Sequence, residues 1–411
     1  MSWKMKSERS WGRLGMKSEW TIKRISDVAE INPRESIKKG TLAKKIPMDI
    51  LQPFTRDIPS FEYEVFKGGT KFRNKDTIMA RITPCLENGK IAQVGCLDPG
   101  EVGFGSTEYI VFRAREETDP DFLYYLICSP FVREPSIKSM VGSSGRQRVQ
   151  TNVVADLQIA VPGIEEQKRI GGLLKALDNK IQLNTKINKN LLKQAMSIYK
   201  AWFCDYILFG GIRPAAWKNT TIDSVSTLVT RGIAPKYDEN SNQIVLNQKC
   251  IRDHTIDLSL ARRHIPKKIN EKWIKKGDLL INSTGTGTLG RVAQVWFDAN
   301  NMTVDSHVTI VRPKSPILES YIGFWGLSHE NEIEAQHTGS TGQTELPRER
   351  VKSMELLLPD AETLSKFNDL VIPMTSTVEL NQEENTRLSQ LRDVLLPKLM
   401  SGKIDVSNID I

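Results

Sequence analysis

The stretch Ile181-Gln-Leu-Asn-Thr-Lys-Ile-Asn-Lys-Asn-Leu191 decides the fold, because it recurs later in the chain as Val378-Glu-Leu-Asn-Gln-Glu-Glu-Asn-Thr-Arg-Leu388. In both copies the apolar residues are three or four positions apart, which is the heptad pattern of a coiled coil. Each copy also has asparagines at the same two seam positions. A buried amide lowers stability but selects one register, because an amide out of register loses its partner. The two copies therefore predict a pair of long helices joined at a polar seam.

The segments that contain these copies have opposite net charge, which favours pairing between them. Residues 162–216 contain nine Lys or Arg against four Asp or Glu, and residues 359–411 contain five against nine. Pro373 is expected to kink the second helix, and Gly171 with Gly172 to loosen the start of the first. The alternative is that each helix packs only on its own domain. The seam residues expected for a coiled coil are Ile170, Leu174, Leu177, Ile181, Asn184, Asn188, Leu191, Trp202, Leu370, Val378, Asn381, Asn385, Leu388 and Leu395.

The repeat extends over nearly the whole chain, which indicates that a domain has been duplicated. The aligned pairs include Trp20 and Trp217, Asp76 and Asp278, Arg113 and Arg312, Gly142 and Gly339, and Pro162 and Pro359. Their spacing changes by a few residues along the chain, as insertions in the surface loops of one scaffold would allow. A repeat of this length is a domain and not a solenoid unit.

Each copy has the same internal order, a globular part followed by a long helix after a proline. Short apolar runs bounded by Gly, Pro, Asn and Asp predict strands at 77–80, 109–112 and 279–281. Short buried helices are expected around 122–128 and 321–327. The predicted fold is α/β (α+β), with two tandem globular domains separated by two long helices that form a coiled coil. The expected divisions are a basic extension at 1–19, globular domains at 20–160 and 217–358, and helical segments at 161–216 and 359–411.

Composition excludes several classes of protein. The chain has 411 residues, of which 39% are hydrophobic and 26% are charged, so disorder along the whole length is excluded. No apolar run approaches the ~18 residues of a membrane helix, and residues 1–19 lack the apolar core of a secretory signal. The five cysteines lie far apart, so neither a zinc site nor a disulfide framework is expected. The sequence predicts a cytoplasmic protein without a membrane partner.

The net charge of +8 permits a polyanionic partner, and two glycine loops indicate where one would bind. The loop at 142–148, Gly-Ser-Ser-Gly-Arg-Gln-Arg, presents two guanidiniums and an amide, which are groups that pair with guanine and adenine in the major groove. The equivalent loop at 338–344, Thr-Gly-Ser-Thr-Gly-Gln-Thr, keeps the glycines and loses both arginines. Two domains that share a backbone conformation but differ in the polar side chains of this loop are expected to read different halves of an asymmetric target. For any single residue of these loops, the alternative is that the loop is merely solvated and its polarity is incidental.

The candidate DNA-binding residues are basic, amide or hydroxyl side chains in these loops and in basic clusters of both halves. They are Arg81, Lys90, Arg146, Gln147, Arg148, Arg231, Lys236, Asn247, Lys249, Arg252, Arg291, Thr341 and Gln343. The hypothesis is that Arg146, Gln147, Arg148 and Gln343 approach bases, whereas the basic clusters supply phosphate contacts.

No catalytic motif accompanies these loops. Gly285-Thr-Gly-Thr-Leu-Gly290 has the spacing of a dinucleotide fingerprint, but such a site needs a helix directly after the glycines. Residues 291–297 have the pattern of a strand, so we interpret the glycines as a connection between strands. The sequence contains no metal-binding histidine spacing, no phosphate-binding loop and no adenine-methyltransferase tetrapeptide. We therefore expect no catalytic residue, metal or cofactor in this chain, with an oxidoreductase that uses Gly285–Gly290 as the alternative.

Four stretches carry a resemblance to a known family. They are Trp20-Thr-Ile-Lys-Arg-Ile-Ser-Asp-Val28, Val161-Pro-Gly-Ile-Glu-Glu-Gln-Lys-Arg-Ile170, Leu246-Asn-Gln-Lys-Cys-Ile-Arg252 and Leu395-Leu-Pro-Lys-Leu-Met-Ser-Gly-Lys-Ile404. Together with the tandem arrangement, they make the chain resemble the specificity (S) subunit of type I restriction–modification systems, the HsdS family, over residues 20–405. The chain departs from the family where the second helix lacks a match to Glu165-Glu-Gln-Lys-Arg169, and residues 1–19 have no family counterpart.

The resemblance implies a non-catalytic subunit that binds double-stranded DNA. Each globular domain would read one half of a split site, and the helices would pair antiparallel as a spacer that docks methyltransferase (M) subunits, two being expected. The M subunits would bind S-adenosylmethionine, and restriction (R) subunits, joined through the complex, would use ATP and magnesium. A coiled-coil scaffold that never touches DNA is the alternative function.

Overall fold

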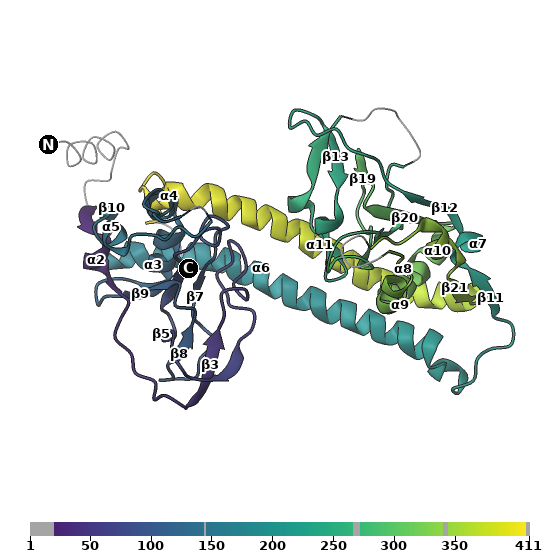
Figure 1. Ribbon diagram of the computed structural model, residues 1–411, viewed down its shortest axis with the longest axis horizontal. Coiled ribbons are helices and arrows are strands. Elements are labelled where there is room, and N and C mark those ends of the chain that lie inside the picture. Colours follow the sequence, from purple (N-terminus) through teal and green to yellow (C-terminus); the bar gives the residue numbers. More distant parts are fainter. Residues whose placement is uncertain (1–19, 144, 266–271, 340–343, 408–411) are drawn as a thin grey trace. The chain divides into compact units, whose positions relative to one another are not determined.

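The computed structural model describes residues 20–143, 145–265, 272–339 and 344–407, and the chain forms two compact units. Unit 1 contains the described residues up to Leu183 and those from Glu384 onward, and unit 2 contains the described residues within Asn184–Glu383. Two long helices, α6 (Ile164–Tyr199) and α11 (Ala361–Met400), each contribute to both units (Figure 1). They begin where the sequence predicts, just after Pro162 and Pro359.

Unit 1 is built on a four-stranded antiparallel sheet with the strand order β2-β9-β6-β7. Its central strands β6 and β9 are buried along the apolar runs at 77–80 and 109–112, which confirms both predicted strands. A second sheet has the order β4-β3-β8-β5, in which β3 and β8 are parallel, and β1 pairs with β10. The strands are β1 Thr21–Arg24, β2 Ala29–Ile31, β3 Leu42–Ile46, β4 Glu62–Val65, β5 Thr70–Phe72, β6 Thr77–Ala80, β7 Ile91–Gln93, β8 Gly103–Gly105, β9 Tyr109–Ala114 and β10 Gln158–Val161.

In unit 1 the helix α3 packs on the first sheet, and α4 packs on α3. The helix α3 begins where the carboxylate of Asp119 accepts a hydrogen bond from the backbone N–H of Phe122 at 2.8 Å, with Pro120 as its first residue. It ends before a second proline, Pro130, and its inward side chains are buried, which confirms the helix expected at 122–128. The short helices of this unit are α2 Ile25–Val28, α3 Pro120–Cys128, α4 Pro130–Lys138 and α5 Thr151–Ala155.

Unit 2 repeats this plan. Its main sheet has the order β12-β20-β17-β18, and in a second sheet, β16-β13-β19, the strands β13 and β19 are parallel. The strand at 279–281 and the helix at 321–327 are both confirmed. The strands are β11 Lys218–Thr221, β12 Ser226–Arg231, β13 Gln243–Leu246, β14 Ile251–Arg252, β15 Thr255–Ile256, β16 Arg262–His264, β17 Leu279–Asn282, β18 Val292–Gln294, β19 Met302–Val304, β20 Val308–Pro313 and β21 Glu355–Leu358. The helices are α7 Ile222–Val225, α8 Glu319–Ser328, α9 Glu330–Ala335 and α10 Arg348–Ser353, and a π-helical turn, Lys200–Cys204, follows α6.

One buried ion pair occurs at the same place in both units. The guanidinium of Arg113 donates from Nε and Nη2 to the two carboxylate oxygens of Asp76 at 2.8 and 2.7 Å. Arg312 binds Asp278 in the same fork geometry and at the same two distances. Because both carboxylates are only 1% exposed, each pair is a fixed element of its sheet and not a surface contact. The aligned sequence positions are thus structurally equivalent.

One expectation about the long helices differs from the structure. Gly171 does not loosen α6, since a Cβ at this residue would lie 2.7 Å from the backbone nitrogen of Phe122. The glycine instead allows α6 to approach the start of α3 closely. The kink expected at Pro373 stays a prediction, and α11 runs as one helix from Ala361 to Met400. Within the described ranges, no helix combines the length and the apolar character that crossing a bilayer requires.

Candidate nucleic-acid interface

In unit 1, the glycine loop at 142–148 is joined to the loop that follows β6. Arg148 forms isolated β-bridges with both Ile82 and Val141. The backbone N–H of Thr83 donates to the carbonyl of Gln147 at 3.0 Å. The two loops are therefore held in one frame, which we call the first reading frame (residues 81–89, 141–143 and 145–149).

The basic side chains of the first reading frame differ in what they contact. Arg148 binds Glu108 through a fork, with Nε and Nη2 at 3.0 and 2.7 Å from the carboxylate, and Arg81 Nε lies 3.2 Å from the same carboxylate. These hydrogen bonds, the one from Arg148 most strongly, lower the pKa of Glu108. Arg146 is exposed, and its guanidinium contacts no carboxylate among the residues described. Both arginines of the loop are exposed, and Arg148 is the one held by an ion pair with Glu108.

The remaining unit 1 candidates are partly committed to the fold. Lys90 is half-buried, and its ammonium donates to the carbonyl of Met48 at 2.8 Å. Gln147 is half-buried, and its backbone carbonyl accepts from the loop after β6. Sequence reasoning missed Arg133 of α4, whose guanidinium lies 5.0 Å from the ring centre of the exposed Phe54. Nothing in the sequence pairs these two residues, because they come from distant segments.

Unit 2 contains an equivalent second reading frame (residues 283–290, 338–339 and 344–346). Glu345 forms β-bridges with Thr284 and Thr338, and the backbone N–H of Leu346 donates to the carbonyl of Ser283 at 2.8 Å. The backbone pattern matches that of the first reading frame, but its bridging residue is acidic. Glu345 is bound by Arg231 Nη1 at 2.5 Å. The candidates Thr341 and Gln343 lie outside the described residues, as does the extension at 1–19.

The other unit 2 candidates divide between exposed cations and structural groups. Lys236, Lys249 and Arg252 are exposed, and Arg291 is half-buried. Asn247 is not available, because its amide donates to the carbonyl of Leu260 at 2.9 Å while its side-chain oxygen caps the turn at Lys249. The missed residues here are those of a cation–π pair on neighbouring segments. Arg262 lies 3.5 Å from the ring centre of Tyr237.

The glycines at 285–290 connect two strands, as predicted. They follow β17, and the chain enters β18 at Val292, so no helix follows these glycines as a dinucleotide site would require. Gly290 has a φ of +83°, and a Cβ there would lie 2.6 Å from the Cβ of Glu334 in α9. The glycine is thus explained by close packing and backbone conformation. Across the described part of the chain, no group of three or more His, Cys, Asp or Glu is arranged to hold a metal ion.

The long helices meet at the predicted asparagines and also pack on the globular cores. In unit 2, Asn381 donates to the side-chain oxygen of Asn188 at 2.7 Å, and Asn188 donates to the carbonyl of Val378 at 3.4 Å. Ile170 and Leu174 belong to the core of unit 1, while Trp202 packs on that of unit 2. The ends of the helices therefore follow the alternative of packing on their own domains. The predicted seam residues Leu177, Ile181, Leu191, Asn385, Leu388 and Leu395 are half-buried, and Asn184 is buried.

One predicted seam position differs from the structure. Leu370 is 44% exposed, whereas the next residue, Val371, is fully buried in the core of unit 2. A straight α-helix drifts from a strict heptad by ~20° per repeat, which is enough to exchange adjacent positions. The inward face at this end of α11 is thus set by the domain core and not by the heptad.

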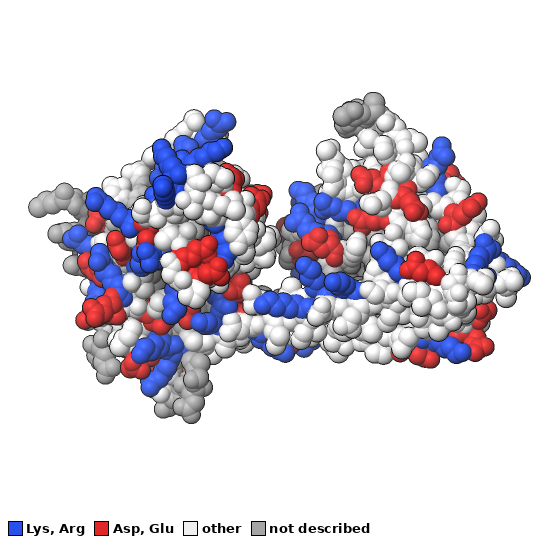
Figure 2. All heavy atoms as spheres, turned by 90° about the horizontal axis from the view of Figure 1, so that it is seen from below, with Lys and Arg blue, Asp and Glu red and all other residues white. Residues whose placement is uncertain are grey.

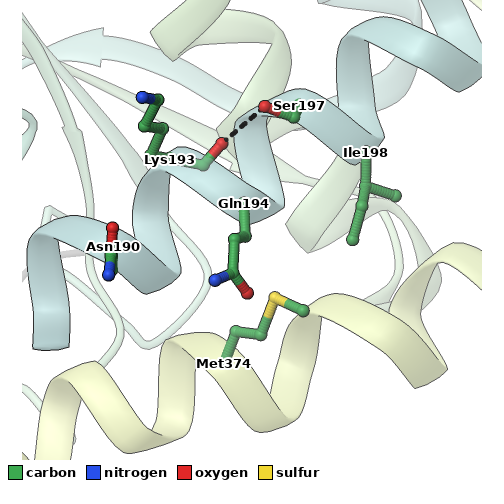
Figure 3. A pocket seen from close by; sticks show the side chains of 6 residues that line it. All are labelled: Asn190, Lys193, Gln194, Ser197, Ile198 and Met374. Carbon is green, nitrogen blue, oxygen red and sulfur yellow. Dashed lines mark hydrogen bonds between the residues drawn. The ribbon is translucent and has the colours of Figure 1, made fainter.

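A shallow groove lies between the two helices within unit 2. It is lined by Asn190, Lys193, Gln194, Ser197 and Ile198 of α6, and by Met374 of α11. In Figure 3, Gln194 points toward Met374, while Lys193 points away from it. The groove thus combines an apolar floor with amide and hydroxyl groups, which is the composition of many protein–protein contacts.

Charged residues of both signs are interspersed on the face of the molecule that Figure 2 shows. The net charge of +8 does not gather there into a patch of one sign.

Comparison with known proteins identifies the class. Residues 17–193 match a family model described as the type I restriction modification DNA specificity domain. The type I restriction enzyme MjaIX specificity subunit of Methanocaldococcus jannaschii is 23% identical over 95% of this chain and 95% of the relative. The EcoAI specificity subunit of Escherichia coli is 34% identical over 37% of this chain and 26% of the relative.

A solved structure shows the same fold. The S subunit of a type I restriction–modification system from M. genitalium has a TM-score of 0.58 and 13% identity, covering 94% of this chain and 96% of that chain. Residues 17–193 thus match the DNA specificity domain of type I restriction–modification systems. The whole chain is similar in sequence and fold to the specificity subunits of these systems, the HsdS family. The resemblance stated from the sequence is confirmed.

Proposed function

We propose that this chain gives a type I restriction–modification complex its DNA sequence specificity by reading a split, asymmetric site. Each unit would read one half of the site, and the long helices would dock M subunits, through which R subunits join the complex. The chain itself would catalyse no reaction. S-adenosylmethionine would then be bound by the M subunits, and ATP with magnesium by the R subunits.

The observation that carries this proposal is the pair of reading frames. Both frames have the same β-bridges, but Arg148 stands in one where Glu345 stands in the other. An unchanged backbone with altered polar side chains is what two domains that read different base sequences require. The exposed Arg146 adds a group able to pair with guanine in the first frame only.

The helices support docking of a protein partner. The groove of Figure 3 is open along the helix pair, and its amide and hydroxyl groups are exposed. Interfaces of this kind combine an apolar centre with a polar rim. An M subunit seated there would be held beside the DNA-reading domain of the same chain.

The test is detection of modified bases by long-read sequencing of the host genome, with this gene intact and with it deleted. The proposal expects a split, asymmetric methyladenine motif that disappears on deletion. If no motif changes in a host that expresses both this chain and its M subunit, the proposed function is wrong. The alternative of a scaffold is tested with the purified complex, because duplex binding that weakens steeply with salt excludes it.

A further inference from the structure

A buried polar cluster joins the first reading frame to both long helices within unit 1. Asp178 of α6 is 6% exposed and accepts a hydrogen bond of 2.8 Å from Arg392 of α11. Its second oxygen accepts from the hydroxyl of Tyr125 in α3 at 2.5 Å. Burial and the carboxylate of Asp178 raise the pKa of Tyr125, so the hydroxyl stays protonated as a donor. Charges removed from water in this way are stable only when their partners are in place.

The same cluster holds the segment 54–56, which lies between the helices and the reading frame. Arg392 Nη1 also donates to the carbonyl of Phe54 at 3.2 Å. Two residues further, Arg56 donates to Asn179 Oδ1 of α6 at 2.7 Å. This segment is therefore bound to α6 by the buried Arg56, which is 5% exposed, and to α11 by Arg392, whose side chain is 13% exposed.

From Phe54 the contacts continue into the first reading frame. The backbone N–H of Phe54 donates to the carbonyl of Gly89 at 3.0 Å, and a Cβ at Gly89 would overlap the Phe54 ring. Gly89 closes the loop after β6, whose Thr83 binds Gln147. An unbroken path of hydrogen bonds and packed groups thus connects Arg392 with the loop that carries Arg146.

Unit 2 lacks this cluster at the aligned positions. In the alignment of the two copies, Arg392 corresponds to Ala195, Asp178 to Thr375, and Tyr125 to Phe324. The hydroxyl of Thr375 bonds within its own helix, and Phe324 packs against Phe367 with ring centres 5.9 Å apart. The corresponding junction of unit 2 is therefore aromatic where that of unit 1 is ionic.

We propose that Asp178 and Arg392 are positioning residues, which fix the first reading frame on the spacer helices and so set how many base pairs separate the two half-sites. This inference rests on the proposed function. One added base pair moves a half-site by ~3.4 Å and rotates it by ~35° about the duplex axis. An apolar junction allows small rotations because packing has little directional preference, whereas a charged hydrogen bond to a buried carboxylate is directional and does not. The ionic junction would make the complex intolerant of such a change.

The test uses the full chain with its M subunit and duplexes built on the methylated motif, with the native spacing and with one base pair added or removed. The readout is the ratio of methylation rates on native and altered spacing. Arg392→Lys keeps a positive charge beside Asp178 but cannot also reach the Phe54 carbonyl. The triple variant Tyr125→Phe, Asp178→Thr, Arg392→Ala copies the residues of unit 2. Ile78→Val, in a core cluster of unit 1 away from the helices, is the control for lost stability.

We expect Arg392→Lys and the triple variant to lower the ratio about tenfold, since small losses of positional order cost one to two orders of magnitude in rate. Ile78→Val should leave the ratio unchanged. A ratio that stays at the wild-type value in Arg392→Lys overturns the inference, as does an equal fall in Ile78→Val. A wild-type complex that methylates no duplex overturns the proposed function, and with it this inference.

Discussion

Arg148 and Glu345 occupy equivalent positions in the two reading frames, and each is held by an ion pair of the opposite sense. Arg148 binds Glu108, which precedes β9, whereas Glu345 binds Arg231 at the end of β12. Glu108 lies in the turn before β9 and Arg231 lies in β12, so the two partners are not at equivalent positions and the charge reversal is not an exchange within one pair. The two frames keep the same backbone bridges while the charge of the bridging side chain changes. The backbone therefore positions the loop, and the side chains decide which groups the loop offers to a ligand.

Removal of the exposed Arg146 should relax base recognition in one half-site. We expect Arg146→Ala to cost about 1–3 kcal/mol of discrimination at one base pair of the half-site read by unit 1, with the other half-site unchanged. The measurement is methylation of duplex libraries in which each half-site is randomised in turn. Lys39→Ala, another exposed cation of unit 1, controls for the loss of charge. Equal relaxation of both half-sites would contradict the assignment.

The Glu108 carboxylate should make the first reading frame sensitive to acid. Because Arg148 and Arg81 lower its pKa below the ordinary value of 4.5, their pairing stabilises the fold above pH 4.5. That contribution is lost as the pH falls through the lowered pKa of the folded state. Glu108→Gln should therefore have a lower melting temperature than the wild type near neutral pH, with the difference shrinking in acid. A difference that is independent of pH would show that the glutamine disturbs packing instead.

Much of the fold could be predicted because its signals are local. The strand β6 coincides with an apolar run between turn residues, and α3 starts at an aspartate followed by proline. The repeat in the sequence also aligns Asp76 and Arg113 with Asp278 and Arg312, which form the equivalent ion pairs of the two units. Such features depend on neighbours in sequence or on comparison of the two halves, and both are visible without a structure.

The site could be predicted only as a set of candidates. Arg146 and Arg148 are two residues apart in the same loop, yet only Arg148 is paired, because Glu108 reaches it from the turn before β9. Asn247 has the type of side chain that reads bases, but it is used to cap a turn. The exposure of Leu370 and the burial of Val371 depend on the core beneath α11. Each of these outcomes is decided by contacts between segments far apart in the sequence.

The helical seam should depend on the pairing of its amides. We expect Asn381→Ala to destabilise unit 2 by about 1–3 kcal/mol, because the buried side-chain oxygen of Asn188 loses its donor. Replacing both asparagines with leucine should recover most of this stability, since neither amide is then left unpaired. Thermal and denaturant unfolding of the single and double variants measure the coupling. Thr377→Ala, an exposed change on the same helix, should stay within about 0.5 kcal/mol of the wild type. Additive losses in the double variant would contradict this account.

The glycine stretch at 285–290 should prove structural and not nucleotide-binding. In Gly290→Ala the new methyl group would meet Glu334 of α9, at a φ of +83° that disfavours a side chain. We expect a loss of about 1–3 kcal/mol in unfolding free energy, with no binding of NAD by either the wild type or the variant. Gly95→Ala is the matched control, because its Cβ would meet no atom within 4 Å and its φ is ordinary. Calorimetric titration with NAD and denaturant unfolding are the two measurements. Saturable NAD binding that Gly290→Ala abolishes would favour the oxidoreductase alternative, whereas instability without binding supports a glycine selected for its close contact with α9.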